Sequence, residues 1–239
     1  MRPKRILIGS VTSVAKNYCI EPWSKNILAI QEYGRNLGHT VDVLVVDNSK
    51  SDHNIKLLKQ KGLPAKWKWY LKNPGIKQVI AECCNILRDK VINEKYDFLL
   101  MVESDVFPPV NCIQLLLLFN KGIVCLPYFH GIGKDSKLVI SNIHKTIGVP
   151  IGQKMSEQEG FIEFNGQLKQ VYQPGLGCFL IRQNVFRAVK FRIAKPDDPG
   201  YFSKAYHDAY FHIDCERLGI PVFMFMGCIC KHLNNNILS

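Results

Sequence analysis

Strand-length apolar runs alternate with helix-length amphipathic segments in this chain, and this alternation constrains the fold most. The apolar runs are Arg5–Val11, Val41–Val46 and Phe98–Val102, and the helical segments between them are 22–38, starting at Pro22 and closing at Gly38, and Ile76–Ile92. Parallel strands require crossover connections of about this length, because each strand must return to the same edge of the sheet. We therefore expect an α/β fold with a mostly parallel central sheet and helices on both faces.

The second half of the chain contains shorter elements. Apolar spacing predicts helices over Val110–Phe119, Gln183–Val189 and Ser203–Leu218, and strands over Ile123–Leu126, Leu138–Ile147, Phe161–Tyr172, the stretch ending at Arg182, and Val222–Cys230. There is no internal repeat, and no linker is long enough to separate two domains. We expect residues 1–239 to form a single domain.

Two carboxylates follow the most apolar of these predicted strands. Phe98–Val102 leads directly into Glu103-Ser-Asp105, and side chains two residues apart in an extended segment lie on the same side. Two neighbouring carboxylates repel each other unless a cation lies near them. A hard divalent ion that also binds phosphate oxygens fits such a pair, although a solvated acidic turn has the same sequence.

Other acidic residues stand at the ends of predicted elements. Asp47 follows Val41–Val46, where a carboxylate can accept hydrogen bonds from a base or ribose, although Asp-Asn-Ser is also a common turn sequence. Asp208 begins an amphipathic helix that ends at Gly219, so it either complements the helix dipole or acts as a general base. Asp214 is a rival base, but it lies two turns further along and is expected to face away.

The formal net charge of +11 at pH 7 favours anionic partners such as phosphates, nucleic acid or an acidic membrane surface. Two basic stretches, His53–Ala81 and Asn165–Pro196, contain no acidic residue. The first contains Lys77 and has Trp67 and Trp69 among its lysines. Proteins hold nucleic-acid strands with lysines and aromatic rings in this way, although a charge run is as often a solvated surface.

Cysteine usage and hydropathy bear on the compartment. The nine cysteines are odd in number and irregularly spaced, which favours free thiols over disulfides. Free thiols are typical of proteins in reducing compartments. Cys228 and Cys230 precede His232, but no second ligand pair completes a zinc site, so we expect both to pack in a buried strand. No apolar run approaches the roughly 18 to 20 residues that span a bilayer, and Ile6–Ile8 is a strand rather than a signal-peptide core. We expect a cytoplasmic protein.

Taken in order, these segments resemble the GT-A glycosyltransferases, especially the large family 2. The segment Asp47–Asp52 looks like the family's nucleotide-binding loop, and Glu103-Ser-Asp105 looks like its DXD motif with glutamate in the first position. The segment Gly175–Arg182 is similar to the glycine-rich acceptor-side strand that ends in arginine. The last two similarities are Asp208, which matches the aspartate of the Glu-Asp pair with His207 in place of the glutamate, and His232, which lies near the family's late histidine.

The resemblance implies a GT-A (Rossmann-like) fold in which residues 1–105 bind a nucleotide-sugar and residues 106–239 bind the acceptor and catalyse transfer. It further implies a hexosyl- or pentosyltransferase that uses a nucleoside-diphosphate sugar, with UDP expected. The implied site residues are Asp47, Asp52, Glu103 and Asp105 for the donor, Asp105 and His232 for Mn²⁺ or Mg²⁺, Asp208 as the general base of an inverting displacement, and Arg182, Lys77, Trp67 and Trp69 on the acceptor or phosphate side.

The acceptor stays open between two classes. The commonest task of the resembling family is assembly of surface glycans or polysaccharides, on a sugar or lipid-linked acceptor. The basic stretches, the aromatic residues and the small size also suit a hydroxylated base of DNA, as in viral DNA glycosylation. A non-catalytic nucleic-acid-binding α/β protein would explain the charge but would leave Glu103, Asp105 and Asp208 without a role.

Overall fold

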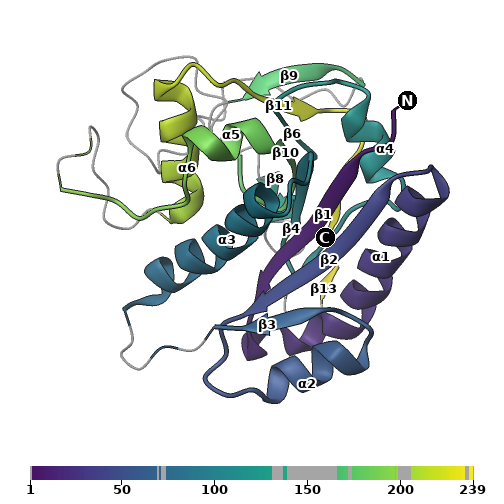
Figure 1. The fold of residues 1–239 in the computed structure, drawn as a ribbon, viewed down its shortest axis with the longest axis vertical. Coiled ribbons are helices and arrows are strands. Elements are labelled where there is room, and N and C mark those ends of the chain that lie inside the picture. The colour runs from purple at the N-terminus through teal and green to yellow at the C-terminus, as the bar shows by residue number, and fades with distance from the viewer. Residues whose placement is uncertain are drawn as a thin grey trace.

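The computed structural model describes residues 2–68, 70, 74–130, 137–138, 166–171, 174–196, 198, 206–234 and 237–238. An eight-stranded sheet in the order β3-β2-β1-β4-β10-β6-β11-β9 forms its centre (Figure 1). The strands are β1 (Arg5–Thr12), β2 (Thr40–Asp47), β3 (Ala65–Trp67), β4 (Phe98–Val102), β6 (Ile123–Cys125), β9 (Leu168–Val171), β10 (Cys178–Arg182) and β11 (Val222–Phe225). The predicted α/β fold with a mostly parallel sheet is confirmed, and both halves of the chain contribute strands to it.

Strand direction changes near the middle of the sheet. The four strands β3, β2, β1 and β4 run parallel to one another, and β11 runs parallel to β6. In contrast, β10 is antiparallel to both β4 and β6, and β9 is antiparallel to β11. The carboxyl ends of β1, β2 and β4 therefore meet at one edge of the sheet, and the carboxyl end of β10 lies at the opposite edge.

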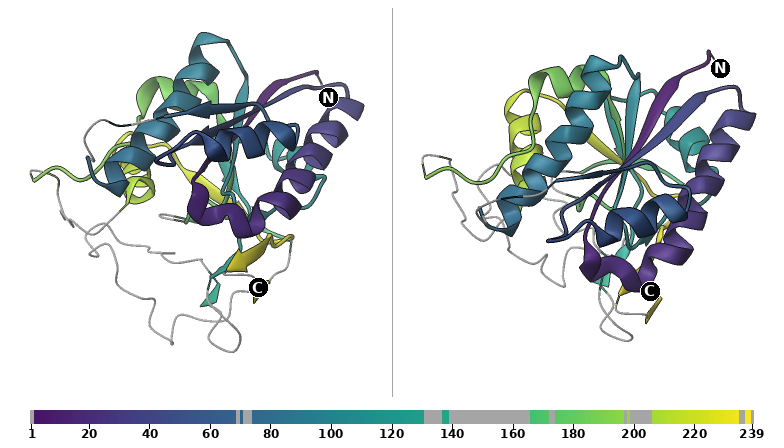
Figure 2. Two further views of the ribbon diagram at one scale, coloured as in Figure 1. Left: turned by 90° about the horizontal axis from the view of Figure 1, so that it is seen from below. Right: turned by 60° about the horizontal axis from the view of Figure 1, so that its bottom comes forward.

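Helices cover both faces of the sheet (Figures 1 and 2). One face packs against α3, α5 and α6, and the other packs against α1, α2 and α4. The helices are α1 (Asn17–Asn36), α2 (His53–Gln60), α3 (Ile76–Asn93), α4 (Cys112–Leu117), α5 (Gln183–Ala188) and α6 (His207–Arg217), and a short 3₁₀ helix, η1 (Val14–Lys16), precedes α1.

The sequence of β4 shows why this layered core forms. All five residues of the strand are buried. Because side chains alternate between the two faces of a strand, Leu99 and Met101 pack with α3 while Phe98, Leu100 and Val102 pack with α1 and α4. An apolar run without alternation is what a strand covered on both faces requires.

Two small sheets lie beside the main one. β12 (Lys231–Asn234) pairs with β5 (Val106–Phe107) and with β13 (Ile237–Leu238), and β7 (Phe129–His130) pairs with β8 (Lys137–Leu138). The pairing of His232 with Val106 brings the end of the chain next to the loop that follows β4.

Several predicted boundaries were wrong. Helix α1 begins at Asn17 rather than at Pro22, which lies inside it. The predicted strand Val222–Cys230 ends at Phe225, where a turn at residues 226–227 follows. The residues after the turn are as apolar as the strand, so the sequence alone did not mark its end. The α2 and β3 segments were seen in the sequence only as a basic stretch. Most of the predicted strands Leu138–Ile147 and Phe161–Tyr172 lies outside the described residues.

The nine cysteines are all free thiols, and eight of them are buried. Within the described ranges, no three His, Cys, Asp or Glu side chains group as a ready-made metal site. Cys230 is buried and Cys228 is partly buried, but neither lies in the strand that was expected to contain them. Among the helices that the structure describes, none combines the length and the apolar character needed to cross a bilayer.

Candidate active site

A pocket of about 400 Å³ opens at the edge of the sheet where β1 and β4 end, a volume typical of small-molecule sites. Its floor comes from Thr12 and from the Glu103-Ser-Asp105 loop. The first residues of α6, the first turns of α3, η1 and β12 also contribute lining residues. Ligands of open α/β sheets bind at this edge, because loops diverge there from the ends of parallel strands.

The loop that carries the two carboxylates is fixed from several sides. The indole N–H of the fully buried Trp23 in α1 donates to the Glu103 carbonyl at 2.9 Å. The Thr12 hydroxyl at the end of β1 lies 3.1 Å from the Ser104 hydroxyl. The Leu233 N–H of β12 donates to the Asp105 carbonyl at 2.9 Å. The helix, the strand and the chain end thus hold the loop in one conformation at the floor of the pocket.

Asp105 lies between two cationic or potentially cationic side chains. Its Oδ2 atom contacts the Lys16 ammonium and lies 3.3 Å from Nε2 of His232. Burial alone would raise the pKa of Asp105, but hydrogen bonds from His232 and Lys16 and the charge of Lys16 hold that pKa below its usual value. Asp105 is therefore ionised at neutral pH although only 6% of its surface is exposed.

Glu103 faces the same pocket in a different electrostatic state. Burial raises its pKa to about 8, and the negative charges of Asp105 and Asp208 add to that effect. Three carboxylates therefore share one pocket, and a nearby cation would favour the ionised form of Glu103. Strongly shifted carboxyl groups in a pocket are a common sign of a functional site.

The residues at Asp105 fit a divalent cation. One carboxylate, one imidazole and the neighbouring Glu103 offer oxygen and nitrogen ligands of the kinds that Mn²⁺ accepts, and the oxygen ligands also suit Mg²⁺. Because no three-residue metal cluster exists among the described residues, such an ion would complete its coordination with water and phosphate oxygens, as Mg²⁺ commonly does in nucleotide sites.

Asp208 lies in the first turn of α6 and lines the same pocket as the Glu103–Asp105 loop. Its Oδ1 atom accepts a hydrogen bond from the Ala209 N–H at 2.8 Å, and the positive end of the helix dipole favours its charge. One turn along the helix, the buried His212 anchors α6: its Nε2 lies 2.8 Å from the Pro174 carbonyl oxygen and donates to it. Burial lowers the pKa of His212 to about 4, so the ring is neutral.

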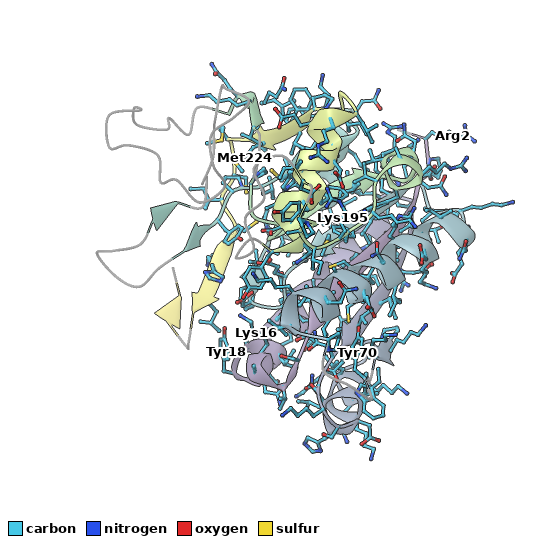
Figure 3. All side chains as sticks on the ribbon, turned by 90° about the vertical axis from the view of Figure 1, so that its left-hand side faces the viewer. Arg2, Lys16, Tyr18, Tyr70, Lys195 and Met224 are labelled. Atoms are coloured by element: carbon cyan, nitrogen blue, oxygen red, sulfur yellow. The ribbon has the colours of Figure 1, made fainter. Side chains whose placement is uncertain are left out.

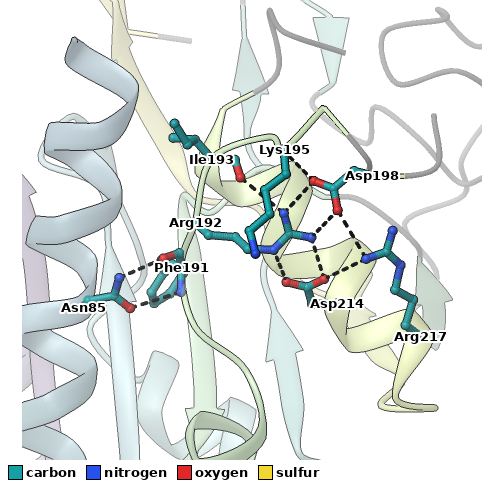
Figure 4. Close-up of polar contacts among 8 residues, drawn as sticks. All are labelled: Asn85, Phe191, Arg192, Ile193, Lys195, Asp198, Asp214 and Arg217. Carbon is teal, nitrogen blue, oxygen red and sulfur yellow. Dashed lines mark hydrogen bonds and ion pairs between the residues drawn. The ribbon is translucent and has the colours of Figure 1, made fainter. Parts of the chain in front are cut away.

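Asp214 faces away from the pocket, as expected from its position on the helix. The Arg192 guanidinium donates to Asp214 from Nε at 2.6 Å and to Asp198 from Nη1 at 2.7 Å (Figure 4). Arg217 lies 3.4 Å from both carboxylates. The basic stretch Asn165–Pro196 is thus partly neutralised by acids that lie outside it in sequence.

This cluster ties the helix of Asp208 to α3. The segment that contains Arg192 is bound to Asn85 of α3, whose amide donates to the Phe191 carbonyl at 2.7 Å and accepts from the Phe191 N–H at 3.1 Å (Figure 4). The Arg88 side chain donates to the Val189 carbonyl at 3.0 Å. The cluster therefore positions α6, and with it Asp208, relative to the helix that lines the same pocket.

Replacing Arg192 with methionine is expected to destabilise the protein by about 2–3 kcal/mol, because it leaves two half-buried carboxylates without their main cation, in a setting that is partly open to solvent. Arg192 holds the pKa of Asp198 at about 2. This stabilisation is present above the usual aspartate pKa of 3.8 and is lost as pH falls toward 2, so the difference between variant and wild type should shrink below about pH 4.

Urea denaturation at pH 7 and at pH 3 measures both parts of this prediction. The matched control is Arg187→Met, which removes a guanidinium whose one described contact is to Gln183 at 3.4 Å on the exposed side of α5. The control should stay within about 0.5 kcal/mol of wild type. Equal effects of the two substitutions would show that the Arg192 cluster does not anchor α6.

Asp47 is buried at the end of β2 and does not line the pocket. Its Oδ1 atom accepts hydrogen bonds from Ser49 Oγ at 2.7 Å and Asn54 Nδ2 at 2.8 Å. Ser49 Oγ in turn accepts from the Val14 N–H at 2.8 Å. The Asp47 Oδ2 atom has no hydrogen-bond partner among the described residues. The arrangement shows a positioning role for Asp47, in which it joins the loop after β2 to the loop after β1.

Asp52 and Trp67 lie on the outside of this loop. The Asp52 carboxylate pairs with Lys56 one helical turn away at 3.1 Å and is about half exposed. The Trp67 indole donates to the Ser49 carbonyl at 2.9 Å and its ring is 38% exposed. A second pocket, of about 280 Å³, shares Ser13 and Asn48 with the first and is otherwise lined by residues 14, 49–51, 53 and 54.

The remaining predicted residues are placed as follows. Arg182 does not reach the pocket, because it ends an antiparallel strand and pairs with Phe98 at the opposite edge, where it donates to Asn120 at 2.7 Å. Lys77 lies beside the pocket, with its ammonium 5.3 Å from the ring centre of Tyr206, a pocket residue. Trp69 lies outside the described residues.

The sequence reading missed Lys16 and Tyr128, which both line the pocket. Both lie in the loop regions that follow apolar strands, Lys16 four residues after the end of β1 and Tyr128 three residues after the end of β6, and that position alone does not single them out. The glycine-rich segment before β10 packs closely against Tyr128. A Cβ atom on Gly177 would lie 2.3 Å from the Tyr128 ring, so only glycine leaves room for this contact. Gly177 also accepts the Glu103 N–H at 3.0 Å, so the close approach of its backbone shapes the floor of the pocket.

No protein-family model matches the chain, and no curated protein matches it by sequence. Solved structures do share its fold. A mycobacterial protein matches 97% of this chain and 68% of its own with a TM-score of 0.54 and 13% identity. Residues 1–349 of TarS from S. aureus match with a TM-score of 0.53 and 13% identity, over 95% of this chain and 59% of theirs.

A third structure, A197 from STIV, matches 97% of this chain and 87% of its own with a TM-score of 0.50 and 14% identity. At these identities the likeness concerns the fold alone. Together with the strand order and the pocket at the carboxyl ends of β1 and β4, it shows that the chain has a GT-A-like α/β fold.

Proposed function

We propose that the protein is a metal-dependent glycosyltransferase that moves a sugar from a UDP-sugar to an acceptor hydroxyl. The observation that carries the proposal is the contact between Asp105 and His232, in a pocket that Glu103 and Asp208 also line. In one pocket, Asp105 and His232 could bind a cation that also binds phosphate, and Asp208 is a separate carboxylate that could accept a proton. The GT-A-like fold supports the same interpretation.

The donor would extend across the two neighbouring pockets. Its base and ribose would bind in the second pocket, against the Asn48–Asn54 loop that Asp47 organises. In this proposal Asp47 does not contact the donor but holds the loop that does. Asp52 could contact the donor only if its ion pair with Lys56 broke. The diphosphate would lie over Asp105 and the sugar would lie toward Asp208 and Tyr128.

Asp105 and His232, with Glu103 beside them, would hold Mn²⁺ or Mg²⁺. When bound, the cation supplies Lewis-acid stabilisation of the charge that builds on the departing phosphate. Asp208 would accept the proton of the acceptor hydroxyl as its oxygen bonds to the anomeric carbon and the bond from that carbon to the phosphate oxygen breaks. A single displacement of this kind inverts the anomeric centre.

The acceptor is proposed to be a glycan or a lipid-linked sugar, in surface polysaccharide assembly. A hydroxylated DNA base is the second candidate, and the net charge of +11 is the observation that favours it. Acceptor binding distinguishes the two, because release of counterions from nucleic acid gives a steep dependence of the dissociation constant on salt. A neutral glycan acceptor would give a shallow one.

Release of UDP from a panel of UDP-hexoses and UDP-pentoses, with and without Mn²⁺, tests the proposal. Each donor is offered with bacterial polysaccharide or with DNA that contains hydroxymethylated bases. We expect UDP release that requires Mn²⁺ and one acceptor class. If the protein binds DNA tightly but releases no UDP from any donor, a non-catalytic nucleic-acid-binding function replaces this proposal.

A further inference from the structure

The ammonium group of Lys16 contacts Asp105, the candidate metal ligand, where a metal ion would bind. Lys16 is the last residue of η1, it lines the pocket, and its ammonium contacts Oδ2 of Asp105, the oxygen that His232 also approaches. The Lys16 side chain is 38% exposed and that of Asp105 is 8% exposed. Lys16 and Tyr18 lie together at the start of α1 (Figure 3). A lysine so placed meets any cation that binds Asp105.

The backbone around Lys16 is held on both sides. The Lys16 N–H donates to the Ser13 carbonyl at 2.9 Å, and the Cys19 thiol lies 3.0 Å from both the Lys16 carbonyl and the Ser104 carbonyl. The Tyr18 hydroxyl donates to the Leu233 carbonyl at 3.1 Å. The segment is thereby attached to the Glu103–Asp105 loop and to β12, so the position of Lys16 beside Asp105 is built into the fold.

The same segment also touches the nucleotide loop. Ser13 and Asn48 line both pockets, and the Val14 N–H donates to Ser49, which binds the buried Asp47. Lys16 thus lies near both the proposed base pocket and the proposed metal site, in the region where the diphosphate of a donor would bind. A phosphate there would offer the ammonium a charge-assisted hydrogen bond in place of the one from Asp105.

An ammonium and a divalent cation compete for one carboxylate oxygen, since like charges at contact distance repel. We propose that Lys16 rests on Asp105 in the ligand-free protein and moves to the donor diphosphate when nucleotide binds, which leaves Asp105 to the metal ion. The inference rests on the proposed function. It makes nucleotide and metal binding mutually supportive, because each ligand removes the competitor of the other.

Replacing Lys16 with methionine should therefore act in opposite directions on the two ligands. Binding of Mn²⁺ in the absence of nucleotide should become about tenfold tighter, because the competing ammonium is gone. Binding of UDP in the presence of EDTA should become about tenfold weaker, because one charge-assisted hydrogen bond is lost. Lys16→Arg keeps the positive charge and should stay close to wild type in UDP binding.

Mn²⁺ binding followed by the EPR signal of free Mn²⁺, and UDP binding followed by calorimetry, measure the two effects. The control is Lys25→Met, on the exposed surface of α1 where Lys25 pairs with Glu21, and it should change neither. If wild type binds UDP with Mn²⁺ but Lys16→Met changes neither affinity, the exchange is wrong and the proposed function stands. If wild type binds neither ligand, both proposals fail.

Discussion

Replacing Asp208 with asparagine is expected to lower kcat for sugar transfer by about 100- to 10,000-fold, the range that general-base catalysis contributes. Asparagine has nearly the same shape and can still accept the Ala209 N–H at the start of α6, but it cannot take a proton from the acceptor. UDP affinity should therefore stay close to wild type. Steady-state transfer kinetics and calorimetric UDP binding measure the two quantities.

The control for this variant is Glu216→Gln on the same helix. Glu216 is exposed and lies two turns beyond Asp208, outside the residues that line the pocket, so its loss should leave kcat unchanged. A near-normal kcat in Asp208→Asn with normal UDP affinity would remove Asp208 as the base. Glu103, another carboxyl group of the pocket, whose pKa burial raises to about 8, would then be the next residue to test.

Asp105→Asn is expected to remove the metal dependence of nucleotide binding. An amide oxygen is a weaker ligand than a carboxylate. Losing a direct ligand should weaken Mn²⁺ binding at least as much as losing an outer-sphere partner, which costs about 10- to 100-fold. UDP binding with Mn²⁺ should fall to the level seen in EDTA, and transfer should become undetectable. Calorimetry with and without Mn²⁺ measures the effect.

The control for Asp105→Asn is Asp89→Asn on α3. Asp89 is about half exposed, pairs with its neighbour Arg88 and does not line the pocket, so the Mn²⁺ dependence should be retained. If Asp105→Asn binds UDP as well as wild type and responds equally to Mn²⁺, the metal is held elsewhere or plays no part in donor binding.

The central sheet could be predicted because its strands have a distinct chemistry. β1, β2 and β4 are apolar runs with sharp polar ends, and their order with α1 and α3 left little choice but a parallel arrangement. The wrong boundaries were those of β11 and α1, because apolar residues alone do not show where a strand ends or a helix begins. The turn at residues 226–227 is as apolar as the strand before it, and Pro22 was taken as a helix start although α1 begins at Asn17.

The candidate site could be predicted only in part, because the amino-acid composition of a strand does not show whether it runs parallel or antiparallel to its neighbours. Glu103, Asp105, Asp208 and His232 do meet in one pocket, as their positions at element ends suggested. Arg182 was expected there too, but β10 is antiparallel and carries it to the far edge. Lys16 could not be ranked above other lysines, since its contact with Asp105 depends on the path of η1.

The one measurement that tests the central claim most directly is thermal unfolding with UDP, with AMP and with neither, each with and without Mn²⁺. At about 100 times its dissociation constant a ligand stabilises the protein by about 2.7 kcal/mol, which raises Tm by about 5–11 °C for a chain of this size. We predict this shift for UDP with Mn²⁺ and a much smaller one for AMP. The absence of a shift with UDP, with or without Mn²⁺, would contradict a UDP-sugar donor site in this pocket.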